Sequence, residues 1–266
     1  MEINRNNIVK IMGEYYVQPD KDYGQNFLVE PDVCQKITEL LDIQNNEKVL
    51  EVGPGIGSLT HFLTMRTSNL SVVDIDRRMI DFLKEKYKKD SINFICEDIR
   101  KTDVSTYDKI IGNLPYNITT ETITYLLLNG IKAKKMVIMC QSEAFPHFND
   151  VTGKEYGPAS VLLHLIGICK RNFTAKPGYF YPMPKCNSTV FTIDIKENAD
   201  FETAKKVYLL AKSLFINRRK TIYNNLLQYL KDKDKTNEVL EKCHILPNYR
   251  PEQLAPEQFL SLYNAI

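Results

Sequence analysis

Two patterns of apolar positions alternate along the chain up to residue 140. Short, continuous apolar runs are typical of buried strands in a parallel sheet, and they are separated by stretches with helical apolar spacing. The predicted strands are 48–52, 70–75, 92–96, 109–112 and 135–140. The predicted helices are 31–41, 59–65, 79–88 and 120–128. This alternation predicts an α/β fold whose parallel sheet is covered by helices on both faces.

The later part of the chain changes character near residue 197. Two runs, 160–168 and 188–195, could add strands to the sheet, and the prolines at 177, 182 and 184 favour extended chain before the second. Beyond 197 the β-branched runs disappear, and helices are expected at 204–230, 238–243 and from Pro256 to about Tyr263. We therefore expect a loose N-terminal arm at 1–21, an α/β domain at 22–198 and a small all-helical domain at 199–266.

Composition narrows the class of protein. The 266 residues are 43% hydrophobic and 26% charged, which is ordinary for a soluble globular chain, and no run is long enough for a membrane span. The first residues lack the apolar segment of a secretory signal. Six cysteines and four histidines are scattered without ligand spacing, so we expect no metal site and a reducing, cytoplasmic location.

The net charge of +2 does not indicate a nucleic-acid-binding protein by itself. Any RNA binding must rest on local basic clusters. The best candidate is Arg218-Arg219-Lys220, which we expect to lie in the middle of a helix between apolar residues. Such a cluster can contact phosphates.

A glycine-rich loop, Glu51-Val-Gly53-Pro-Gly55-Ile-Gly57, follows the first predicted strand and leads into a helix. Its glycines allow a tight turn and a close approach to a ligand. The spacing differs from a nicotinamide-binding loop and, with its leading acid, is the usual form for S-adenosylmethionine. Asp74 ends the second strand and can accept hydrogen bonds from ribose hydroxyls, and Asp98 follows the third and can accept from an adenine amino group. Asp76 is interpreted as a helix cap.

The segment Asn113-Leu114-Pro115-Tyr116 follows the fourth predicted strand, at the edge where open α/β sheets place their chemistry. It resembles the motif of methyltransferases that modify the exocyclic amine of adenine. That amine is a poor nucleophile because its lone pair is delocalised. If the Asn113 side-chain oxygen and the Leu114 carbonyl each accept one N–H, the lone pair is freed to attack a sulfonium methyl, and Tyr116 can stack on the ring.

A second aromatic side chain is needed on the other face of a flipped base. Phe180 is the best candidate, although composition alone leaves Tyr179 and Tyr181 equally good.

Seven ordered segments together resemble the ribosomal RNA adenine dimethyltransferase family, which includes the KsgA-type small-subunit enzymes and the Erm resistance enzymes. The matching segments are 23–28, 51–57, 74–76, 97–98, 112–118, 156–157 and 180–185. The resemblance implies a Rossmann-like methyltransferase sheet with a C-terminal helical domain. It implies that S-adenosylmethionine is contacted by Asn26, Leu28, Gly53, Asp74, Asp98 and Asn113. It also implies that the target adenine is held by Asn113, Leu114, Tyr116 and Phe180, and selects Phe180 over its tyrosine neighbours.

The C-terminal segments 215–226 and 250–254 are similar to the KsgA-type branch. That branch dimethylates two adjacent adenosines in a hairpin loop near the 3′ end of small-subunit ribosomal RNA. The expected partner is therefore ribosomal RNA or the immature small subunit, and the expected state is a monomer without membrane or metal. Two alternatives remain, an Erm-like enzyme acting on large-subunit RNA and a ribosome-assembly factor with residual activity.

Overall fold

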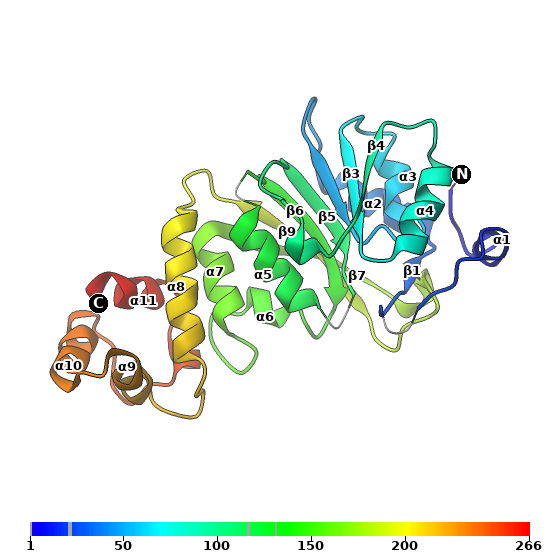
Figure 1. The fold of residues 1–266 in the computed structure, drawn as a ribbon. Helices are drawn as coiled ribbons and strands as arrows, with labels where there is room; N and C mark the ends of the chain where they lie inside the picture. Colours follow the sequence, from blue (N-terminus) through cyan, green and yellow to red (C-terminus); the bar gives the residue numbers. More distant parts are fainter. Residues whose placement is uncertain (1, 21–22, 116–117, 131) are drawn as a thin grey trace. The chain divides into compact units, whose positions relative to one another are not determined.

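The computed structural model describes residues 2–20, 23–115, 118–130 and 132–266 (Figure 1). The chain forms two compact units. The first comprises residues 1–143 and 170–194, and the second comprises 144–169 and 195–266. The second unit therefore contains a segment, 144–169, that the sequence pattern places in the α/β domain. Among the described residues, no helix has the length and apolar character needed to cross a bilayer.

The first unit is built on a seven-stranded sheet with the order β4-β3-β2-β5-β6-β9-β7. Five of its strands are parallel, namely β2 (Val49–Val52), β3 (Leu70–Asp74), β4 (Ile92–Cys96), β5 (Lys109–Asn113) and β6 (Lys135–Gln141). β9 (Ser188–Ile195) runs antiparallel to β6, and the two edge strands are β7 (Gly167–Ala175) and β4. The predicted parallel strands are confirmed to within a residue or two at each end.

The strand order changes direction between β2 and β5. The chain proceeds from β2 outward through β3 to β4, and then returns to pair β5 with the other side of β2. Val52 pairs with Gly112, so the loops that follow these two strands start side by side. In open α/β sheets, ligands bind at such a switch point, outside the carboxyl ends of the strands.

Helices connect the parallel strands. They are α3 (Ser58–Leu63), α4 (Arg77–Lys86) and α5 (Thr119–Asn129), with a short 3₁₀ helix η1 at Ile99–Lys101, and α2 (Pro31–Glu39) precedes β2. α4 packs on β3 and β4 through the buried side chains Met79, Ile80, Phe82 and Leu83. A separate two-stranded sheet pairs β1 (Phe27–Leu28) with β8 (Phe180–Tyr181), which follows the 3₁₀ helix η2 (Pro177–Tyr179).

The N-terminal arm is more ordered than predicted. Residues Ile8–Glu14 form α1, with Ile8, Ile11 and Met12 buried. Apolar residues spaced three and four apart give this short helix a side that can join the core. The expectation of a loose arm at 1–21 is therefore wrong for this stretch.

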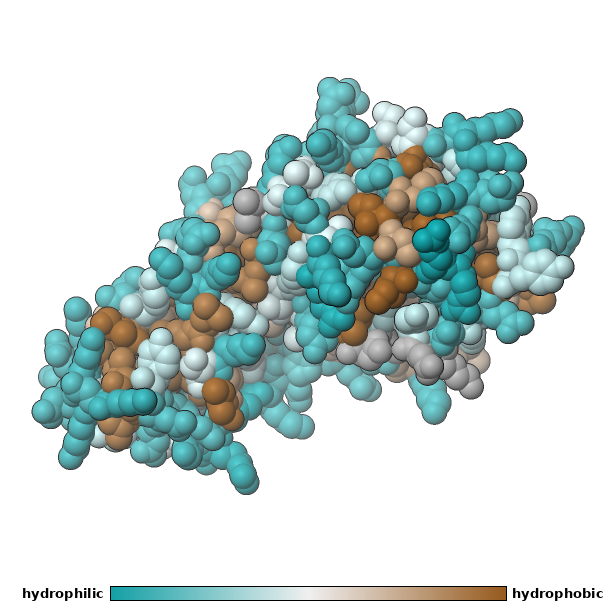
Figure 2. All heavy atoms as spheres, viewed as in Figure 1, coloured by the Kyte–Doolittle hydropathy of each residue, from teal (hydrophilic) through white to brown (hydrophobic). Residues whose placement is uncertain are grey.

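The second unit is mainly helical, although it also includes the first residues of β7. It contains α6 (Pro146–Asn149), α7 (Pro158–Ile166), α8 (Phe201–Leu214), α9 (Ile222–Leu230), α10 (Lys233–Lys242), η3 (Pro251–Gln253) and α11 (Pro256–Ala265). A core around Tyr156, Phe215 and Phe259 holds these helices together. Polar side chains cover most of the face seen in Figure 2, with apolar patches between them.

Two predictions about these helices are wrong. The run 160–168, predicted as a strand, lies mostly in α7, which is apolar on nearly every side because it is buried in the unit. Such a run cannot be distinguished from a buried strand by periodicity, although Pro158 at the first turn is a helix-start signal. The predicted helix 204–230 is interrupted at 215–221, where Thr221 caps α9 by accepting a hydrogen bond from the Asn224 backbone N–H.

Candidate active site

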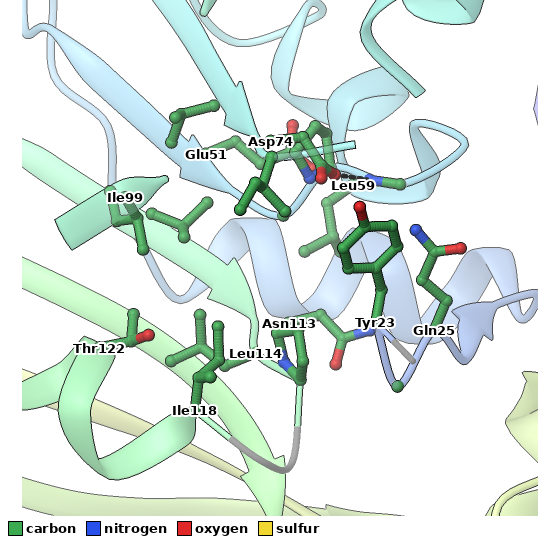
Figure 3. A pocket seen from close by; sticks show the side chains of 18 of the residues that line it. Tyr23, Gln25, Glu51, Leu59, Asp74, Ile99, Asn113, Leu114, Ile118 and Thr122 are labelled. Atoms are coloured by element: carbon green, nitrogen blue, oxygen red, sulfur yellow. Dashed lines mark hydrogen bonds between the residues drawn. The ribbon is translucent and has the colours of Figure 1, made fainter. Parts of the chain in front are cut away.

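One pocket lies at the carboxyl ends of β2, β3 and β5, at the switch point of the sheet (Figure 3). Its walls come from four parts of the first unit, namely the loops after these strands, the η1 turn, the start of α5 and the segment 23–28. The pocket brings together most of the predicted site residues, which are Asn26, Leu28, Gly53, Asp74, Asp98, Asn113 and Leu114. Their roles toward a ligand stay predictions.

The glycine loop needs glycine at the positions that approach the pocket. Gly53 and Gly55 have φ angles of 67° and 53°, a backbone conformation that residues with a Cβ rarely adopt. A Cβ on Gly55 would also lie 2.9 Å from two ring carbons of Phe27. The loop therefore packs directly under the segment 23–28, and its backbone forms one wall of the pocket.

Asp74 presents its carboxylate from the end of β3. Its Oδ1 accepts the Asp76 backbone N–H at 2.9 Å, and its Oδ2 accepts the Gly55 N–H at 3.4 Å (Figure 3). Burial raises the pKa of Asp74 to about 6. Each carboxylate oxygen can accept a further hydrogen bond, so the pair suits two adjacent hydroxyls of a ribose.

Glu51 lies at the floor of the pocket and was not among the predicted site residues. It is 1% exposed, and its Oε2 accepts the Thr60 hydroxyl at 2.6 Å. Burial raises the pKa of Glu51 to about 7, and the buried Lys86 ammonium nearby has its pKa lowered to about 8 by the same cause. The signal in the sequence is an acid in a buried strand immediately before the glycine loop.

Asp98 is already engaged by a neighbour. The Arg100 guanidinium donates Nη2 to Oδ2 at 2.6 Å and Nε to Oδ1 at 3.0 Å, and this pairing holds the pKa of Asp98 below its usual range. Arg100 itself lines the pocket and was missed. The signal in the sequence is the spacing Asp-Ile-Arg at a turn. At this spacing the aspartate that caps the turn can also bind the arginine side chain.

Asn113 ends β5 with its amide directed across the pocket toward the segment 23–28 (Figure 3). Its Nδ2 donates to the Asn26 carbonyl at 3.3 Å, which leaves Oδ1 as the acceptor facing a ligand. The Leu114 N–H donates to the Met139 carbonyl at 3.0 Å, and among the described residues no hydrogen bond reaches the Leu114 carbonyl. Tyr116, the predicted stacking residue, lies outside the described residues.

Hydrogen bonds and ion pairs connect the segment before β1 to the start of α4. Gln25 Nε2 donates to Asp76 Oδ2 at 3.0 Å, and Arg78 bridges Asp76 and Asp20. Asp76 also caps α4 by accepting the Arg78 backbone N–H, which confirms its predicted capping role. This network positions Asn26, and through its carbonyl the Asn113 amide.

Phe180 does not line the pocket. It is 1% exposed and pairs with Leu28 across the two-stranded sheet. Its neighbour Tyr181 is half-buried and lines a second cavity, which shares Asn26 with the first. Stacking by Phe180 therefore stays a prediction, and the tyrosine alternative has the more accessible ring.

The basic cluster of the second unit lies in the connection between α8 and α9, so its predicted position in mid-helix is wrong. Arg218 donates to Glu252 Oε2 at 3.2 Å and to the Tyr156 carbonyl at 2.9 Å. The side chains of Arg219 and Lys220 are exposed, and neither side chain makes a hydrogen bond or an ion pair with the described residues. The prediction of an RNA contact now applies best to these two.

Metal ligands are absent from the described part of the chain, where no cluster of three or more His, Cys, Asp or Glu side chains could hold an ion.

Comparisons with known proteins identify the family of the chain. The family model described as ribosomal RNA adenine dimethylase matches residues 17–266. The ribosomal RNA small subunit methyltransferase A of Malacoplasma penetrans is 35% identical, over 90% of this chain and 89% of that protein. A dimethyladenosine transferase structure from Plasmodium falciparum has a TM-score of 0.76 at 25% identity and covers 89% of this chain and 95% of its own. The 23S rRNA methyltransferase ErmE, with a TM-score of 0.68 and 20% identity over 90% of this chain and 99% of its own, shares the fold. The chain belongs to the S-adenosylmethionine-dependent ribosomal RNA adenine dimethyltransferase family, whose Rossmann-like fold was predicted from the sequence.

Proposed function

We propose that this protein transfers two methyl groups from S-adenosylmethionine to the exocyclic N6 amine of adenosine in small-subunit ribosomal RNA. The observation that carries the proposal is the Asn113 amide, whose Nδ2 donates to the Asn26 carbonyl and whose Oδ1 has no hydrogen bond with the described residues. The names of the curated relatives, such as that from Malacoplasma penetrans, support the small subunit as the source of the RNA.

The pocket fits the methyl donor by its shape and by its hydrogen-bond acceptors. Gly53 and Gly55 let the backbone approach the ligand, and Asp74 offers two carboxylate oxygens for a ribose. Ile99 and Arg100 line the pocket together with Asp98, where an adenine ring would lie. S-adenosylmethionine supplies an electrophilic methyl group on a sulfonium sulfur.

The chain's contribution to the chemistry is to change the geometry of the target amine. Asn113 Oδ1 and the Leu114 carbonyl can each accept one N–H, and the nitrogen lone pair then points out of the ring plane. The N6–C bond forms as the S–C bond breaks, the thioether leaves with the sulfur electron pair, and the extra proton on N6 passes to water. Positioning the two reactants supplies the rest of the rate.

We propose that the domain at 199–266 binds RNA and that the domain at 22–198 carries the catalytic site. We also propose that the protein acts in the cytoplasm as a monomer on the immature small subunit. Mass measurement in solution tests the monomeric state, and binding to unmethylated small subunits tests the partner.

The test of the reaction is methyl transfer from labelled S-adenosylmethionine to unmethylated small subunits and, in parallel, to naked large-subunit RNA. We expect dimethyladenosine near the 3′ end of the small-subunit RNA only. Label confined to large-subunit RNA would move the protein to the Erm-like alternative. Absence of label from both would favour an assembly factor without turnover.

The matched variants are Asn113→Ala and Asn69→Ala. Asn113→Ala removes an acceptor that acts on the reacting amine, so we expect the turnover number to fall by about 10²–10³. Asn69 is an exposed asparagine at the opposite end of the strands, immediately before β3, and its replacement should leave turnover unchanged. Equal turnover in both variants would refute activation by Asn113.

A further inference from the structure

A second cavity lies beside the catalytic pocket in the first unit. Its walls come from α1 and the residues that follow it, from the extended segment 181–185 and from Gln141 at the end of β6. Gly24, Gln25 and Asn26 line both cavities, so one stretch of backbone forms their common wall. A molecule in the second cavity would therefore lie next to whatever occupies the first.

The rim of this cavity carries exposed apolar side chains. Val9, Tyr16 and Met183 are 60%, 93% and 69% exposed, and all three line it. Exposed apolar groups that gather around one hollow mark an interaction site more often than isolated ones do. Lys185 is exposed on the same rim and forms no ion pair with the described residues.

Tyr16 is the most informative of these residues. It follows the end of α1 with a φ of 53°, where its N–H and that of Val17 bond back to the Gly13 and Met12 carbonyls. Helices commonly end on a glycine in this conformation, and a bulky residue rarely adopts it. The ring is almost fully exposed and adds nothing to the core, so folding gives no reason for a tyrosine here.

We propose that this cavity binds the nucleotide next to the target adenosine, with its base stacked on the Tyr16 ring and its phosphate near Lys185. The inference rests on the proposed function, because it takes the adenosine to lie against Asn113. Asn26 lines this cavity and also holds the Asn113 amide, so the neighbouring nucleotide and the target base share a wall. An aromatic face, amide groups and a free cation are the parts that bind single-stranded RNA.

The test uses an RNA hairpin that contains the target adenosine, together with versions in which each neighbouring nucleotide is abasic. Tyr16→Gly removes the ring and suits the backbone, whereas Tyr16→Phe keeps the ring and removes the hydroxyl. Hairpin affinity is measured by fluorescence anisotropy, and KM and the turnover number by methyl transfer. Melting temperature and S-adenosylmethionine affinity report whether the variants remain folded.

We expect Tyr16→Gly to weaken hairpin binding and raise KM about tenfold, with little change in the turnover number or in S-adenosylmethionine affinity. Tyr16→Phe should bind as the wild type does. With the correct neighbour made abasic, wild type and Tyr16→Gly should bind equally, because the stacked base is missing from both.

Three results would overturn the proposal. The first is a Tyr16→Gly affinity for the intact hairpin equal to that of the wild type. The second is a loss of affinity in Tyr16→Gly that is the same for every abasic hairpin, and the third is a loss of affinity seen only with whole small subunits. The last result would identify a ribosomal protein as the occupant. The binding assay needs no turnover, so a wild type that binds the hairpin without methylating it would refute the proposed function and leave the Tyr16 site supported.

Discussion

Replacing Arg218 by alanine separates folding from RNA binding in the basic cluster. Its guanidinium donates to Glu252 Oε2 at 3.2 Å, to the Gly153 carbonyl at 3.2 Å and to the Tyr156 carbonyl at 2.9 Å. It also lies over the Phe215 ring at 5.4 Å from the centroid. Arg218 therefore joins three separate segments of the helical unit, whereas the adjacent Arg219 is exposed and joins none.

The expected cost follows from these contacts. A hydrogen bond from a charged donor contributes roughly 1.5–3 kcal/mol when it is shielded, and a partly exposed ion pair roughly 0.2–1 kcal/mol. Arg218 and Glu252 side chains are 39% and 26% exposed, so water can replace part of what is lost. We expect Arg218→Ala to lower the free energy of unfolding by about 2–3 kcal/mol, and Arg219→Ala to change it by less than about 0.5 kcal/mol.

The two variants are compared by urea unfolding and by RNA affinity over a range of salt concentrations. Loss of one phosphate contact reduces the slope of log affinity against log salt by about 0.7–0.9. We expect that reduction for Arg219→Ala, with wild-type stability. Wild-type stability in Arg218→Ala, combined with a reduced salt slope, would contradict the reasoning and make its guanidinium an RNA contact.

Two further predictions concern the cofactor pocket. Because the Asp74 pKa is about 6 in the free protein and an ionised carboxylate accepts the ribose hydroxyls, S-adenosylmethionine affinity should be full above pH 6 and fall below it. Calorimetric titration should show a loss of about tenfold per pH unit that is absent in Asp74→Asn, and affinity independent of pH would contradict this role. Gly55→Ala should cost about 1–3 kcal/mol of stability and weaken cofactor binding about tenfold, through its positive φ and its clash with Phe27. Gly153→Ala, at a φ of 101° with open space around the new Cβ, should leave cofactor affinity unchanged, and equal affinities in the two variants would argue against the clash.

The parallel strands could be predicted because a strand buried on both faces is a continuous apolar run in the sequence. β2, β3, β5 and β6 are buried along most of their length, whereas the edge strand β4 is only partly buried. The carboxyl ends of these strands carry the glycine loop, the acids and Asn113. Since parallel strands end at one edge of a sheet, the order of these motifs along the chain was enough to predict that they converge.

The remaining features depend on contacts that local patterns do not report. α7 is apolar on nearly every side, so its run of residues fits a strand and a buried helix equally well. The bonds of Arg218 reach 34 residues to Glu252 and 62 residues to Tyr156. Nothing near Arg218 in the sequence distinguishes it from Arg219, and only the folded unit separates a structural arginine from an exposed one.

The segment 23–28 connects the two halves of the proposed chemistry. It packs over the glycine loop through Phe27, and it positions the Asn113 acceptor through the Asn26 carbonyl. Its own place is fixed by Gln25, which donates to the buried Asp76 at the start of α4. The cofactor wall and the amine acceptor therefore depend on the same short stretch of backbone, and that stretch also forms the wall shared with the second cavity. Under the proposed function, a substrate base held by Asn113 would be oriented by the same element that covers the methyl donor. This would bring the nucleophile and the methyl group together without a general base.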